Sequence, residues 1–235
     1  MVKKIGIIGA MEEEIRLLLQ SMDSIKKTTY YSFDFYEGVL SGNTVVLCQS
    51  GIGKVNASIC VSLMKVLFDV DLLINTGTAG GVDPGLTVGN LVIGQSLVHH
   101  DVDVTAFDYE IGQMAGMPIA YYSDGFLLQK AREAADSLQM RAVVGQIASG
   151  DQFVSHAQSI DQIKAKFPHV RAVEMESAAI AQASYVLDVP FVIIRAISDN
   201  GDQEAALSFD EFLIQAGARS AKLVKALLLQ INYEI

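Results

Sequence analysis

Three acidic stretches of the sequence contain side chains that could carry acid–base chemistry. Three glutamates follow an apolar run at residues 12–14, two glutamates flank Met175, and Asp199 closes the segment RAISD at residues 195–199. A positioned carboxylate can act as a general base, and a carboxyl group that keeps its proton can act as a general acid. Structural roles are the alternative, because acidic residues stabilise the first turn of a helix and Asp often caps one.

The surroundings of each acidic stretch bear on this choice. A helix that starts near residue 12 spreads the three glutamates around its axis, so only one of them needs to face a cleft. Glu174 and Glu176 sit among apolar residues, and charge at the end of a buried strand usually has a function or a partner. Arg195 lies in an otherwise apolar strand and must be paired, most naturally with a carboxylate. Asp199 suits a helix cap and a general acid equally well.

Glycine-rich segments follow several of the apolar runs. Residues 75–81 (NTGTAGG) bring three glycines into five positions, which lets backbone N–H groups approach a ligand and favours a binding loop. Residues 50–54 (SGIGK) lack the spacing of a phosphate-binding loop and indicate a tight turn into a helix. Residues 6–11 (GIIGAM) lack the G-x-G-x-x-G pattern, and the glutamates behind them would repel a pyrophosphate. No nicotinamide cofactor is expected.

Composition excludes several other classes of protein. The net charge of −10 opposes a nucleic-acid surface, which needs a basic stripe. No apolar run approaches the ~20 residues of a membrane span. His99 and His100, followed by Asp101 and Asp103, suggest a metal site, but alternation along a strand puts the two histidines on opposite faces. No metal is therefore expected.

The cysteines and the N-terminus bear on the location of the protein. Cys48 and Cys60 show no metal-binding spacing and suit buried thiols. The apolar run near the N-terminus is short, ends in glutamates and offers no convincing cleavage site, so it indicates a first strand rather than a signal peptide. We expect a cytoplasmic protein.

Strands and helices alternate along the chain, which is typical of an α/β fold. The sequence predicts one domain over residues 1–235, a three-layer α/β/α sandwich around a mixed, mostly parallel sheet, and a long irregular loop at 105–122. Strands are expected at residues 4–10, 30–40, 44–49, 71–75, 88–104, 142–148, 170–174 and 191–197, and helices at 11–22, 54–68, 125–138, 160–167, 177–187 and 209–231.

The polar and glycine-rich clusters fall at the carboxyl ends of the expected strands, where α/β folds bind ligands. This repeated placement predicts one shared site. Apolar residues close to the clusters predict an apolar pocket beside it. The clusters are residues 11–14, 50–53, 76–81, 149–153, 174–176 and 198–199.

Taken in order, these motifs closely resemble those of the 5′-methylthioadenosine/S-adenosylhomocysteine nucleosidases, within the nucleoside phosphorylase superfamily. The resemblance spans nearly the whole chain and implies the nucleoside phosphorylase-like fold, a homodimer, adenine nucleoside substrates and no cofactor. It also implies hydrolysis of the N-glycosidic bond, in methionine salvage and methyl-cycle recycling. The segments that carry it are IGIIGAMEEE (5–14), SGIGKVNA (50–57), NTGTAGG (75–81), HDVDVTAFDYEIGQ (100–113), SGDQF (149–153), VEMES (173–177), RAISD (195–199) and LSFDEF (207–212).

The resemblance also implies roles for individual residues. Glu14 would activate the attacking water, Asp199 would protonate the adenine ring at its seventh nitrogen, and Glu176 would hold the ribose hydroxyls. To carry a proton near neutrality, Asp199 would need a raised pKa. The other expected substrate-binding residues are Met11, Ile52, Thr78, Ala79, Gly80, Phe153, Val154, Met175, Arg195, Ser198 and Phe209, with Val104 and Phe107 supplied by the partner subunit.

Three positions depart from the family pattern. Thr78 stands where the family usually has Ser, which keeps the hydroxyl and adds a methyl group. Ala115 replaces a proline expected in the intersubunit loop, and Asn200-Gly201 varies the segment after Asp199.

Other functions stay open on the same fold. A phosphorylase would need cationic partners for phosphate, but Asn75 stands where related phosphorylases place an Arg, and Glu14 would repel phosphate. A non-catalytic nucleoside-binding protein would not need Glu14, Glu176 and Asp199 together. A hydrolase of futalosine-like nucleosides is a third alternative.

Overall fold

A mixed ten-stranded sheet lies at the centre of the computed structural model, which describes residues 4–199 and 205–232. In chain order the elements are β1 (Lys4–Gly9), α1 (Glu12–Gln20), β2 (Asp23–Tyr30), β3 (Phe33–Leu40), β4 (Asn43–Gln49), α2 (Lys54–Phe68), β5 (Leu72–Gly81), β6 (Leu91–His99), the 3₁₀ turn η1 (Thr105–Phe107), β7 (Tyr121–Tyr122), α3 (Gly125–Ser137), β8 (Ala142–Ser149), α4 (Ala157–Lys166), β9 (Val170–Glu174), α5 (Ser177–Val186), β10 (Phe191–Asp199) and α6 (Ala205–Asn232).

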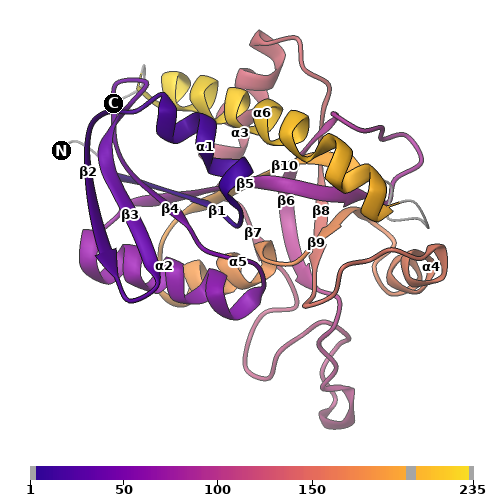
Figure 1. Cartoon of the computed structure of the whole chain (residues 1–235). Coiled ribbons are helices and arrows are strands. Elements are labelled where there is room, and N and C mark those ends of the chain that lie inside the picture. Colours follow the sequence, from indigo (N-terminus) through magenta and orange to yellow (C-terminus); the bar gives the residue numbers. More distant parts are fainter. Residues whose placement is uncertain (1–3, 200–204, 233–235) are drawn as a thin grey trace.

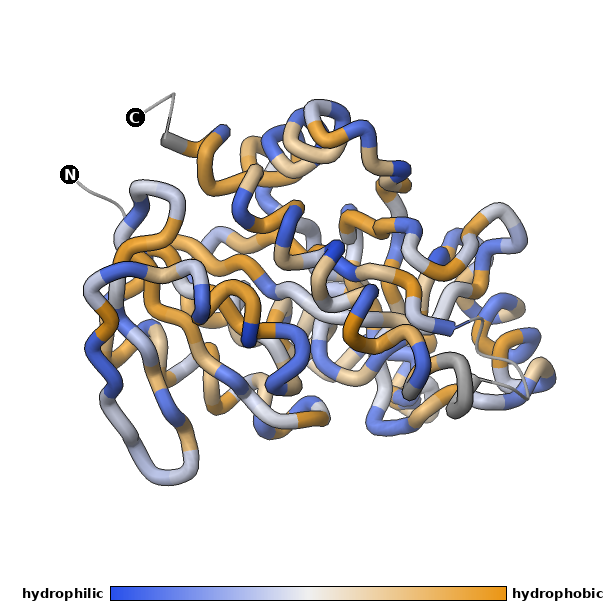
Figure 2. The backbone as a smooth tube through the Cα atoms, turned by 45° about the horizontal axis from the view of Figure 1, so that its top comes forward, coloured by the Kyte–Doolittle hydropathy of each residue, from blue (hydrophilic) through white to orange (hydrophobic). Residues whose placement is uncertain are grey.

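Helices cover both faces of the sheet. α1, α3 and α6 lie on one face, and α2 and α5 lie on the other (Figure 1). Successive side chains of a strand point to opposite faces, so Leu72 and Ile74 of β5 pack with the first group of helices and Leu73 packs with the second. The central strands are consequently apolar along much of their length (Figure 2). The predicted three-layer α/β arrangement is confirmed.

The sheet departs from a simple open sandwich in its pairing. Its order is β10-β6-β8-β9-β5-β1-β4-β3-β2, and β10 also pairs with β5, so β10, β6, β8, β9 and β5 close into a ring. The sheet is mixed, as predicted, but among the described strands antiparallel pairings are as frequent as parallel ones. The antiparallel pairs come from the hairpin-connected strands β2, β3 and β4, from the reversed neighbours in the ring and from β7 beside β6. Sequence periodicity does not reveal them.

Two segments differ from their predicted conformation. Residues 75–81, expected as a loop, continue β5 to Gly81, and Gly77, Gly80 and Gly81 have no positive φ. The edge strand β2 falls where no strand was expected, because its residues are almost all exposed and leave no alternating apolar pattern. None of the described helices is long and apolar enough to cross a lipid bilayer.

The expected loop at 105–122 includes the short η1 and β7 but is otherwise without regular structure. It projects from the body of the molecule below the sheet in Figure 1. α6 begins at Ala205, four residues before the predicted start, and α4 begins at Ala157, three residues early.

Candidate active site

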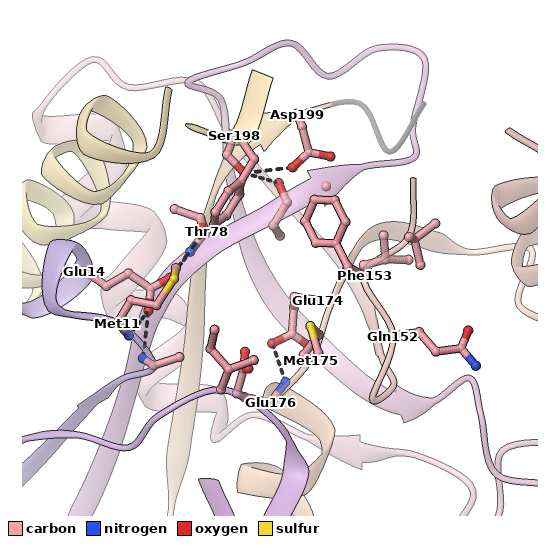
Figure 3. Close-up of a pocket in the computed structure, with 17 residues that line it drawn as sticks. Met11, Glu14, Thr78, Gln152, Phe153, Glu174, Met175, Glu176, Ser198 and Asp199 are labelled. Atoms are coloured by element: carbon pink, nitrogen blue, oxygen red, sulfur yellow. Dashed lines mark hydrogen bonds between the residues drawn. The ribbon is translucent and has the colours of Figure 1, made fainter. Parts of the chain in front are cut away.

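A pocket of about 290 Å³ opens beside the carboxyl ends of β1, β5, β9 and β10, where the polar clusters meet (Figure 3). Most of the residues predicted for the site line this pocket: Met11, Glu14, Ile52, Thr78, Ala79, Gly80, Phe153, Val154, Met175, Glu176, Ser198, Asp199 and Phe209. The convergence follows from the topology: the parallel strands β1, β5 and β10 end at the same edge of the sheet. The antiparallel strand β9 joins them because its last residues pair with the last residues of β5.

Three predicted residues lie elsewhere in the subunit. Arg195 is buried behind the pocket wall and is absent from the lining, which corrects its expected role in substrate contact. Val104 and Phe107 lie on the projecting segment outside the pocket of their own chain, and Phe107 is 74% exposed. Residues 200 and 201, where the sequence departs from the family pattern, lie outside the described part of the chain.

The pocket also has lining residues that were not predicted: Ala10, Gln152, Val173 and Glu174. Ala10, Gln152 and Glu174 are chain neighbours of predicted residues, and Val173 belongs to the same VEMES motif as Met175, so the motifs contained the signal. Which of two adjacent residues faces the pocket depends on where the strand ends and on the side of the sheet to which each side chain points.

Glu14 is the buried member of the three glutamates and is only 3% exposed, whereas Glu12 points to solvent. Its Oε2 accepts hydrogen bonds from the backbone N–H groups of Ala10 (2.7 Å) and Met11 (3.1 Å). Its Oε1 accepts from the N–H of Thr78 at 2.9 Å and from the Thr78 hydroxyl at 3.1 Å. The turn from β1 into α1 therefore aims this carboxylate across β5.

The pKa of Glu14 is raised above its ordinary value. Burial is the main cause, and the positive charge of Arg195 together with the backbone hydrogen bonds from Thr78, Ala10 and Met11 partly offsets it. A carboxylate whose pKa is moved towards neutrality is a better general base than an ordinary one.

The missing side chain of Gly77 leaves space for the side chains of Glu14 and Arg195. A Cβ at residue 77 would lie 2.7 Å from Glu14 Oε1 and 3.0 Å from Arg195 Nη1, closer than side chains pack in proteins. This glycine therefore serves side-chain packing against an extended strand, and not the loop conformation expected from the sequence.

Glu174 and Arg195 form a fully buried ion pair under the pocket, as the sequence predicts for Arg195. Arg195 Nη2 lies 2.7 Å from Glu174 Oε2 and donates to Asn75 Oδ1 at 2.6 Å. Glu174 also accepts from the hydroxyl of Ser149 and from the N–H and hydroxyl of Ser177. Burial alone would raise the pKa of Glu174, but Arg195 and these hydrogen bonds hold it below its ordinary value.

Glu176 diverges from Glu174 because the chain changes from β9 into α5 between them. Its Oε1 accepts a hydrogen bond from the N–H of Gly53 at 2.9 Å, in the turn that begins α2. Gly53 has a φ of 95°, which glycine adopts without strain. Burial, followed by the nearby charge of Glu174, raises the pKa of Glu176 to about 8.

Asp199 reaches the pocket through a bulge in β10. Ile197 pairs with Ala79 and Asp199 pairs with Gly80, so Ser198 is an extra residue in β10. A bulge of this kind re-aims the side chains that follow it. Asp199 is 2% exposed, and its Oδ2 accepts a hydrogen bond from the Ser198 hydroxyl at 2.9 Å.

The acidic groups occupy different parts of the pocket. Figure 3 shows Asp199 beside Phe153 on one side and Glu14 beside Met11 on the other. The ring of Phe153 meets that of Phe209 edge-on, with centroids 5.7 Å apart. Apolar and aromatic surface near Asp199 suits a flat base, and the opposite carboxylates suit hydroxyl groups or positive charge.

The charges of the site exclude some ligands. No Lys, Arg or His is among the described residues that line the pocket, so an anion such as phosphate would meet carboxylates without a cationic partner. Within the described ranges, no three His, Cys, Asp or Glu side chains are grouped to hold a metal. The pocket is suited to proton transfer around a neutral ligand.

Comparison with known proteins gives a consistent family. A family model of the phosphorylase superfamily matches residues 4–229. The 5′-methylthioadenosine/S-adenosylhomocysteine nucleosidase of Lysinibacillus sphaericus (strain C3-41) is 47% identical over 222 residues, covering 94% of this chain and 96% of the relative.

Solved structures agree with this comparison. The nucleosidase of the same description from Neisseria meningitidis, in complex with methylthio-immucillin-A, is 48% identical with a TM-score of 0.96, covering 97% of this chain and 99% of that chain. The futalosine hydrolase of Helicobacter pylori strain 26695 is 35% identical with a TM-score of 0.93, covering 97% of each chain. The chain therefore belongs to the phosphorylase superfamily and, within it, to the family of 5′-methylthioadenosine/S-adenosylhomocysteine nucleosidases.

Proposed function

We propose that this protein hydrolyses the N-glycosidic bond of 5′-methylthioadenosine and S-adenosylhomocysteine and releases adenine and the 5-thio-substituted ribose. The observation that carries the proposal is the convergence of Glu14, Glu176 and Asp199, all less than 10% exposed, on one largely apolar pocket. Relatives at 47–48% identity bear the name of this activity, and one of them binds methylthio-immucillin-A. The reaction serves methionine salvage and methyl-cycle recycling.

Each carboxyl group has a separate part in the reaction. Glu14 takes a proton from water as the water oxygen bonds to the anomeric carbon of the ribose. The bond from that carbon to adenine breaks, and Asp199 gives its proton to the seventh ring nitrogen, so adenine leaves as a neutral base. Glu176 holds the ribose hydroxyls. An ionised carboxylate beside the sugar, as Glu14 provides, stabilises the cation-like transition state more than the neutral ground state.

The alternative of phosphorolysis has less support. Phosphate would need a bidentate cation, and the nearby Arg195 already donates to Glu174 and Asn75. A purely binding role is also disfavoured, because three buried carboxyl groups are costly to bury and nucleoside binding does not require them. Perturbed pKa values such as that of Glu176 are typical of catalytic sites.

The activity is tested by following adenine release from 5′-methylthioadenosine with and without inorganic phosphate. We expect equal rates in both conditions and 5-methylthioribose as the other product. A sugar phosphate formed only with phosphate would instead identify a phosphorylase, and binding without turnover would identify a binding protein. Futalosine is assayed alongside, because a futalosine hydrolase shares the fold at 35% identity. Faster release from futalosine would overturn the assigned substrate.

The role of Asp199 is tested by Asp199→Asn, which keeps the shape of the side chain and removes its acidic proton. Turnover should fall by roughly 10²–10⁴-fold, while the Kd for the nucleoside, measured by calorimetry, stays close to that of the parent. Asp161→Asn, at an exposed position of α4, is the matched control. Retained turnover in Asp199→Asn would remove this residue from the mechanism.

We further propose a homodimer in which Phe107 of each chain completes the pocket of its partner. An apolar groove on α2 and α5 is lined by Val55, Ile59 and Val186, which are 69%, 42% and 60% exposed. Met114, on the segment that carries Phe107, borders the same groove. A second copy seated there would cover this apolar surface and would bring the projecting segment next to the partner.

Light scattering during size-exclusion chromatography tests this assembly. The protein should elute with twice the 25.4 kDa mass of one chain, and Val55→Glu should elute as a monomer with a raised KM for 5′-methylthioadenosine. A monomeric parent protein at micromolar concentration would exclude the dimer. We also propose a cytoplasmic location, in accord with the free, buried thiols of Cys48 and Cys60.

A further inference from the structure

Gly80 leaves a space that the carboxyl group of Asp199 occupies. A Cβ built at residue 80 would lie 2.9 Å from Asp199 Oδ1 and 3.4 Å from Val173 Cγ2. Separations below about 3.0 Å do not occur for real Cβ atoms, so any other residue at this position would displace a neighbour. Gly80 has no positive φ, and its backbone conformation would therefore admit other residues. The requirement for glycine is one of space.

The strands on either side prevent the main chain from yielding. β5 is paired with β10 on one side, where Gly80 lies opposite Asp199, and with β9 on the other, where Gly80 lies opposite Val173. The pairing holds Gly80 between two neighbours. The terminal atoms of the Asp199 side chain are the most easily moved contact of an added methyl group.

The other oxygen of the same carboxyl group is also held. Ser198, the extra residue of the β10 bulge, donates its hydroxyl to Asp199 Oδ2 at 2.9 Å. The Ser198 hydroxyl therefore contacts one oxygen of Asp199, and the other oxygen lies where a side chain at residue 80 would begin. We propose that Gly80 is a positioning residue for the proton donor of the reaction: its missing side chain sets the place of the Asp199 carboxyl group.

This inference rests on the proposed function, in which Asp199 gives its proton to the leaving base. A general acid must lie within about 2.6–3.2 Å of the atom that it protonates, and a misplacement of about 1 Å can cost roughly 10²-fold in rate. In Gly80→Ala we therefore expect kcat to fall about 100-fold. The Kd for 5′-methylthioadenosine should change much less, because the pocket walls remain.

Gly81→Ala is the matched control. Its Cβ would also be tightly placed, 3.2 Å from Ile197 Cγ2, but the nearest Asp199 atom is the backbone oxygen at 3.6 Å. The same substitution one residue further along β5 thus strains the same strand without touching the carboxyl group. We expect kcat of Gly81→Ala to stay within about threefold of the parent, well short of the loss that a misplaced group causes. Equal kcat losses in both variants would overturn the proposal.

A thermal-unfolding cycle tests the same contact without reference to activity. Gly80→Ala should lower the Tm of the parent, whereas in an Asp199→Ala background, where the carboxyl group is gone, the added methyl group should lower it much less. Such coupling is the mark of residues in direct contact. Equal Tm losses in the two backgrounds would overturn the inference, even if Gly80→Ala folds too poorly for kinetics.

The two tests separate this inference from the proposed function. If the parent protein releases no adenine, the proposed function fails, while the unfolding cycle still reports whether Gly80 makes room for Asp199. If the parent is active and the cycle shows no coupling, only the role of Gly80 fails. Parent-like kcat in Gly80→Ala contradicts the positioning role whatever the cycle shows.

Discussion

Replacing Glu174 with Gln would test how the charges beneath the pocket are held. This carboxylate accepts hydrogen bonds from the hydroxyls of Ser149 and Ser177, the N–H groups of Glu176 and Ser177, and the guanidinium of Arg195. An amide has the same shape, but its NH₂ group would face donors. Glu174→Gln therefore loses both the negative charge beside a buried Arg195 and some of these hydrogen bonds.

The magnitude follows from the burial of the pair. Both side chains are less than 5% exposed, and breaking a buried ion pair typically costs about 3–5 kcal/mol. Glu14 and Glu176 also act on Arg195 and raise its pKa together with Glu174, so we expect the lower end, about 3 kcal/mol. For a chain of this size, 1 kcal/mol shifts Tm by about 2–4 °C, which predicts a loss of roughly 6–12 °C.

Differential scanning calorimetry, with urea unfolding as a second measure, checks this value at pH 7. Asp69→Asn makes the same acid-to-amide change in the exposed Lys65–Asp69 pair and should cost less than about 1 kcal/mol. Because the folded pKa of Glu174 lies below its ordinary value of 4.5, its stabilising effect is present above pH 4.5 and is lost as the pH falls further. A Glu174→Gln protein as stable as Asp69→Asn would refute the reasoning.

Three further substitutions probe the carboxylates around the pocket. Glu176→Gln should become progressively more stable than the parent from pH 4.5 to about 8, where the parent's unfolded carboxyl is ionised but its folded one is not; a pH-independent Tm difference would contradict this. Gly77→Ala should lower kcat about 100-fold by displacing Glu14, and parent-like kinetics would exclude it. Thr78→Val should lower kcat about 10-fold or more through the lost hydroxyl donor to Glu14, whereas Thr78→Ser should not.

Much of the site could be predicted because the motifs are short and follow strands. The acidic stretches at residues 12–14, 174–176 and 199 were compatible with acid–base chemistry, and the family resemblance singled out Glu14, Glu176 and Asp199. The α/β topology predicts that strand ends meet. The roles of the remaining charges could not be predicted in the same way. Arg195 had to be paired on physical grounds, but among several glutamates only the structure identifies Glu174 as its partner.

The glycines of residues 75–81 show why the sequence predicted a loop where the structure has a strand. A glycine in a sequence has two interpretations, because it can allow a positive φ or leave space for a neighbouring side chain. The first interpretation predicts a loop. The second interpretation holds for Gly77 and Gly80, which lie in an extended strand against the side chains of Glu14 and Asp199. Those neighbours are 63 and 119 residues away along the chain, so no local pattern records them.

By itself, the sequence determined the alternation of strands and helices, the apolar strand interiors and the presence of three acidic groups at strand ends. These properties depend on residue type and on periods of two or 3.6 residues, which are local. The tertiary structure alone decided that β10 closes a ring with β5, that a bulge at Ser198 turns Asp199 towards Gly80, and that Glu174 rather than Glu176 neutralises Arg195. Register, burial and charge pairing are properties of segments brought together by folding, and they set which carboxyl groups keep a proton.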